Sequence, residues 1–68
     1  MNLEEFERKD RRNYLRASII VAEYARDLYL SKVPGDHAYS HRAGQHIARL
    51  AAELVDLGGD LRNLESRD

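Results

Sequence analysis

The chain of 68 residues contains no cysteine and no tryptophan, one proline and four glycines. Without cysteine it can form no disulfide, no zinc–thiolate site and no cysteine nucleophile. No apolar run approaches the ~18 residues that a membrane-spanning helix requires. The acidic start of the sequence, residues 2–5, does not resemble a secretory signal. We therefore expect one small, soluble, cytoplasmic domain with no membrane association.

Charge is nearly balanced, with 11 Lys and Arg against 12 Asp and Glu and a formal net charge of −1. The chain as a whole is therefore neither a polycation nor a polyanion. The distribution is uneven, because residues 8–16 carry five basic side chains and one acidic side chain. This segment is the strongest local concentration of positive charge.

Residues 2–32 contain neither glycine nor proline. This absence predicts one long helix over about residues 3–32. Asn2 is suited to cap its N-terminus, and Glu5 stands three residues later, where a capping box places an acid.

The dipeptide Pro34-Gly35 is the only strong turn signal and predicts a single reversal over residues 33–36. Proline cannot donate a backbone hydrogen bond and disfavours a helical conformation in the residue before it. The reversal makes the helices antiparallel, so that facing residues have numbers that sum to about 70. On this register, Tyr24 is expected to pack over Gly44.

The second helix is expected over about residues 37–57, with Asp36 as N-cap. Its apolar residues recur at alternating spacings of three and four, the a/d pattern of a coiled-coil seam. The pattern continues past Gly58-Gly59, so we expect a short or kinked helical end over 60–66 without a change of direction. The seam comprises Ala43, Ile47, Leu50, Leu54, Leu57, Leu61 and Leu64.

The first helix carries more apolar surface than a two-helix hairpin can bury. A single core below ~70 residues seldom supplies enough stability, and association of two hairpins is the usual remedy. We therefore predict an all-α fold, an antiparallel two-helix hairpin completed as a four-helix bundle by homodimerisation. The expected interface residues are Ile19, Ile20, Val21, Tyr24, Leu28, Ile47, Leu50, Leu54 and Leu57, with Ile19 and Val21 on the flank that self-association covers.

Arginines recur every four residues at Arg8, Arg12 and Arg16 and form one stripe. Arg12 and Arg16 have no acid four residues before them, so their charges are expected to be available to a partner. The predicted binding residues are Arg8, Arg12, Arg16, Tyr39, His41 and Arg42. The competing interpretation is a solvated face whose arginines pair with preceding glutamates.

No pattern in the chain indicates catalysis. His37 and His41 have a spacing that can bind a metal from one helix face, but no glutamate completes an HExxH pattern. No nucleophilic triad, GxGxxG motif or phosphate-binding loop is present. We predict no catalytic residues, no metal and no cofactor.

Three functions remain open. The first is a non-catalytic protein-interaction module, an adaptor or inhibitor that occupies a partner's surface, as phage-encoded inhibitors of host machinery do. The second is a small nucleotide or nucleic-acid binding protein that uses an Arg/His/Tyr surface of a dimer, whose binding would weaken steeply with salt. The third is a structural subunit of a larger assembly, which would show no stable isolated species at low concentration.

Overall fold

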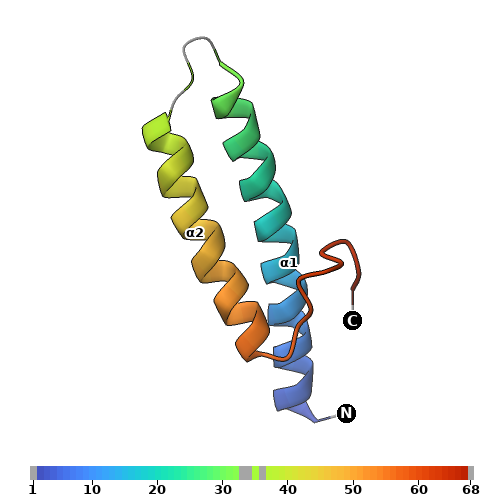
Figure 1. Ribbon diagram of the computed structural model, residues 1–68. Coiled ribbons are helices and arrows are strands. Elements are labelled where there is room, and N and C mark those ends of the chain that lie inside the picture. Colours follow the sequence, from blue (N-terminus) through green and yellow to red (C-terminus); the bar gives the residue numbers. More distant parts are fainter. Residues whose placement is uncertain (1, 33–34, 36, 68) are drawn as a thin grey trace.

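The computed structural model describes residues 2–32, 35 and 37–67, which form helices and turns and no strand. Helix α1 spans Leu3–Leu30 and helix α2 spans His37–Asp56. The two helices run antiparallel, side by side (Figure 1), in a rod of 50 × 17 × 17 Å. The predicted all-α helical hairpin is therefore confirmed.

Helix α1 begins as the sequence predicts. The Oδ1 atom of Asn2 accepts a hydrogen bond of 2.8 Å from the backbone N–H of Glu5. Glu4 and Glu5 lie in the first turn, where the helix dipole favours negative charge. The helix ends at Leu30, two residues before the predicted end.

The register between the helices agrees with the predicted reversal. Leu15 and Leu54 meet in the core, and the rings of Tyr29 and Tyr39 are 4.1 Å apart between centroids. The chain reverses between α1 and α2, where the sequence places the turn. The proline of that turn and the predicted cap Asp36 lie outside the described residues.

The core of the hairpin is small. Its fully buried apolar side chains, among the described residues, are Leu15, Ile19 and Leu54. Partly buried side chains packed around them are Ile47, Leu50, Ala51, Leu57 and Leu64. On α2, Ile47, Leu50 and Leu54 of the predicted seam thus pack inward, together with Ala51.

The inward face of α1 differs from the predicted one. Its inward positions, all buried or half-buried, are Leu15, Ile19, Ala22, Arg26 and Tyr29. Ile20, Tyr24 and Leu28, which are among the predicted interface residues, do not pack against α2 and are exposed. The run Ile19-Ile20-Val21 places apolar side chains on opposite sides of the helix, so periodicity alone indicates two faces without choosing between them.

Gly44 in α2 does not lie under a tyrosine. A Cβ atom added at Gly44 would have no neighbouring atom within 4 Å, because Tyr24 is 71% exposed and on the far side of α1. Glycine in a helix interior is less favourable than alanine by ~0.5–1 kcal/mol. We therefore expect Gly44→Ala to raise the free energy of unfolding by about that amount in urea denaturation. A loss of stability would show that another group occupies this space.

Helix α2 ends in a Schellman motif. Gly58 has a positive φ of 86°, and the backbone N–H groups of Gly58 and Gly59 donate to the carbonyls of Val55 and Leu54 at 2.9 and 2.8 Å. A side chain at Gly59 would collide with that of Leu54. The two glycines therefore stop the helix and turn the chain.

The C-terminal tail, residues 57–67, contains no helix and crosses α1 (Figure 1). The predicted helical end over 60–66 is therefore wrong, because the left-handed conformation at Gly58 redirects the chain. Leu64 still packs against the core cluster, but it does so from the tail.

Within the tail, the backbone N–H of Arg62 donates to the Asp60 carboxylate at 2.8 Å, which lowers the pKa of Asp60.

Candidate interaction surface

Helix α1 carries a second apolar face that α2 does not cover. Successive residues of a helix are rotated by about 100°, which places this face on the side opposite Leu15 and Ile19. Its large side chains are between 49% and 71% exposed. We call them the outer face of α1: Leu3, Phe6, Tyr14, Val21, Tyr24 and Leu28.

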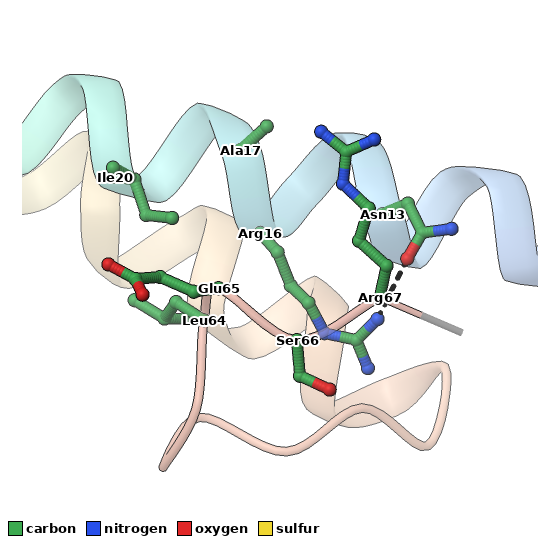
Figure 2. A pocket seen from close by; sticks show the side chains of 8 residues that line it. All are labelled: Asn13, Arg16, Ala17, Ile20, Leu64, Glu65, Ser66 and Arg67. Atoms are coloured by element: carbon green, nitrogen blue, oxygen red, sulfur yellow. Dashed lines mark hydrogen bonds between the residues drawn. The ribbon is translucent and has the colours of Figure 1, made fainter.

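The C-terminal tail borders the outer face along one edge. A groove of about 450 Å³ lies between them, and its apolar lining comes from Ile20 and Tyr24 of α1 and from Leu61 and Leu64 of the tail. A second hollow of about 220 Å³ continues along the tail past Arg16 (Figure 2). The tail thus leaves the opposite edge of the outer face open.

Arg12 and Arg16 make hydrogen bonds within the chain. This corrects the prediction that their charges are available to a partner. Arg16 is only 7% exposed, and its Nη1 donates to Oδ1 of Asn13 at 3.0 Å (Figure 2). The Nη1 of Arg12 donates to the backbone carbonyl of Leu57 at 3.1 Å. Both arginines therefore lie where the tail leaves α2 and crosses α1.

Arg11 also uses its charge within the hairpin. Its guanidinium pairs with the Glu53 carboxylate of α2 at 3.0 Å, and these hydrogen bonds raise the pKa of Arg11. The same guanidinium lies 5.0 Å from the centroid of the Tyr14 ring. Arg8, by contrast, is exposed. Three of the five basic side chains in residues 8–16, those of Arg11, Arg12 and Arg16, thus make hydrogen bonds within the fold.

The other predicted binding residues lie on α2. Tyr39 packs its ring against Tyr29 of α1, whereas His41 and Arg42 are exposed. Residues 37–52 of α2 contain two arginines and three histidines and no acid. The exposed side of this segment is therefore polar and carries positive charge, in contrast to the outer face of α1.

The structure divides the predicted interface residues into two groups. Those that pack inside the hairpin are Ile19, Ile47, Leu50, Leu54 and Leu57. Those that are exposed are Ile20, Val21, Tyr24 and Leu28. Ile19, expected on the open flank, is thus a core residue. Sequence reasoning also missed Leu15, although it stands four residues before Ile19 on the same side of the helix.

Within the described part of the chain, no three His, Asp or Glu side chains are grouped so that they could hold a metal ion. Neither of the described helices is long and apolar enough to cross a membrane. No family model, no curated protein and no solved structure matches this chain.

Proposed function

We propose that this chain is a non-catalytic protein-interaction module, an adaptor or inhibitor, whose principal contact surface is the outer face of α1. The supporting observation is the exposure of six large apolar side chains along one side of one helix. Contiguous apolar patches of this kind on small proteins mark interaction sites. Three of the six are aromatic, Phe6, Tyr14 and Tyr24, a residue class enriched at the centres of interfaces.

The first partner in this proposal is a second copy of the chain. Three fully buried apolar side chains among the described residues make a small core, and domains of this size usually gain stability by association. Two hairpins packed through α1 would bury both outer faces in one four-helix assembly. Both α2 helices would then remain outside, where they can bind a further molecule.

Val21 and Val55 provide a matched test, because both are valines and both are exposed, by 67% and 52% respectively. Val21 belongs to the outer face of α1, whereas Val55 lies on α2. An unpaired carboxylate in an interface costs several kcal/mol, so Val21→Asp should weaken self-association by ~100-fold or more. Val55→Asp should leave it unchanged.

Sedimentation at tens of micromolar chain, with circular dichroism to check helicity, measures this difference. The expected result is a dimer for the parent chain and for Val55→Asp, and a helical monomer for Val21→Asp. A folded parent chain that stays monomeric at these concentrations would contradict self-association through this face.

A small nucleotide or nucleic-acid binding protein is the second candidate function. The observation in its favour is that residues 37–52 of α2 contain no acid and expose Arg42, Arg49, His37, His41 and His46. Phosphate contacts weaken steeply as salt concentration rises, whereas contacts with the apolar outer face of α1 do not. A structural subunit of a larger assembly would use that same apolar face.

A further inference from the structure

We propose that one edge of the outer face of α1 and the neighbouring side of α2 together bind an acidic amphipathic helix of a partner protein. This inference rests on the proposed interaction module and names the chemistry of its partner. It follows from two strips of exposed side chains, one on each helix, that border the same face of the hairpin.

The first strip lies on α1 and is apolar. Its members stand seven residues apart and are between 49% and 67% exposed; we call Tyr14, Val21 and Leu28 the apolar strip. Ser18 and Ala25, which are small and half-buried, lie between this strip and the core positions of α1. None of these five residues lines either hollow along the C-terminal tail. The apolar strip is thus the open edge of the outer face.

The second strip lies on α2 and is basic. Arg42, His46 and Arg49 recur at spacings of four and three, which places them on one side of the helix, and all three are exposed. We call them the basic strip. Glu53 continues the same side four residues later, but its carboxylate pairs with Arg11 of α1 at 3.0 Å. The positive charge of the basic strip is therefore next to an acid that already has a partner.

Contacts between the helices place both strips on one face of the hairpin. The Arg11 guanidinium bridges the helices, because it lies 3.0 Å from the Glu53 carboxylate and 5.0 Å from the centroid of the Tyr14 ring. Tyr14 begins the apolar strip, and Glu53 continues the basic strip. Towards the turn, the ring of Tyr29 packs against that of Tyr39, which stands three residues before the basic strip. The two strips therefore run side by side between these two contacts.

The charge on this face has one sign. The acids of residues 14–28 are Glu23 and Asp27, and both line the hollow along the tail, on the other side of α1. Residues 37–52 of α2 contain no acid. The face therefore presents apolar side chains along α1 and positive charge along α2.

A helix with an apolar side and an acidic edge is complementary to this face. Charged residues that flank an apolar seam select the partner of a helix, and a helix laid along the apolar strip would set one edge beside the basic strip. The apolar strip is about 21 Å long, which four turns of a partner helix cover. A phosphate backbone would satisfy the basic strip but would leave the apolar strip in water. A protein partner is therefore favoured over a nucleic acid.

Two synthetic helical peptides of about 15 residues test this assignment. They share one leucine side and differ only along its edges, which carry glutamates in one peptide and lysines in the other. The parent chain should bind the glutamate peptide ~10-fold or more tightly than the lysine peptide, because oppositely charged groups face each other across the contact. Fluorescence anisotropy of the labelled peptides measures both affinities.

The double variant Arg42→Glu and Arg49→Glu should reverse the order of the two peptides. The matched control is Arg62→Glu with Arg67→Glu, which changes the net charge equally at exposed tail residues and should keep the order of the parent chain. Circular dichroism checks that both variants keep their helices. If the control loses the glutamate peptide as well, total charge selects the peptide and the inference is wrong.

The remaining outcomes separate this inference from the proposed function. Equal binding of the two peptides by the parent chain would contradict an acidic partner and leave an apolar contact surface standing. A DNA duplex that displaces the glutamate peptide would assign the basic strip to nucleic acid instead. A chain that forms dimers yet binds neither peptide would overturn the inference and leave self-association standing, whereas a monomeric chain that binds neither would remove both.

Discussion

Replacing Leu54 with alanine is expected to lower the free energy of unfolding by ~2–5 kcal/mol, the range found for buried leucines. Leu54 is completely buried and forms the core cluster with Leu15 and Ile19. Its side chain also lies directly against the backbone of Gly59, where α2 ends. The truncation therefore opens a cavity between the helices and loosens the point at which the tail departs. A loss of this size is a large part of the total stability of any small domain.

Urea denaturation followed by circular dichroism measures this loss, and all variants must be compared at one chain concentration because self-association contributes to stability. Leu61→Ala is the control, since it removes the same atoms from a tail residue that is 44% exposed. We expect the control to cost less than ~1 kcal/mol. Equal losses in the two variants would show that the core is not centred on Leu54.

The sequence predicts one helix of the hairpin better than the other. The inward face of α2 follows from its pattern, because α2 has a single apolar stripe and the hairpin has one place to bury it. Helix α1 has two apolar stripes, one with Leu15 and Ile19 and one with Tyr24 and Leu28, and periodicity alone does not choose between them. Choosing between them requires the three-dimensional fit against α2, in which the small Ala22 and the branched Ile19 face the seam.

The sequence pattern does not predict the path of the tail, and the reason is different. Leu61 and Leu64 continue the seam of α2 in phase, so the hydrophobic pattern favours a helix that continues past the glycines. Glycine within a helix costs about 1 kcal/mol per residue. This signal is weaker than the hydrophobic pattern, but it correctly indicates that α2 ends before the two glycines. Gly58 adopts a left-handed conformation that glycine accepts readily, and the tail then reaches the core from another side.

The roles of the arginines could not be read from local spacing. A rule based on residues four apart in one helix detects partners within that helix. The partner of Arg11 is Glu53, 42 residues away, and the backbone group bound by Arg12 is 45 residues away. Long-range partners of this kind follow from the antiparallel register, which brings the N-terminal half of α1 beside the end of α2 (Figure 1).

The double change Arg12→Glu and Arg16→Glu is therefore expected to destabilise the chain by about 3 kcal/mol or more. At position 16 it places a carboxylate at a site that is only 7% exposed, beneath the tail. At position 12 it removes the donor to the Leu57 carbonyl and sets a negative charge beside the negative end of the α2 dipole. The tail should detach first, because both positions contact it or the residue from which it starts.

Amide hydrogen exchange resolves the two stages of this effect, since residues 57–67 should lose protection before the helices do. Arg8→Glu, at an exposed position four residues earlier in the same stripe, is the control and should change stability by ~0.5 kcal/mol or less. If the double variant keeps native stability and native tail protection, the arginines do not hold the tail, and the prediction that they contact a partner would stand. Loss of tail protection with the control unaffected would establish that Arg12 and Arg16 hold the tail against α1.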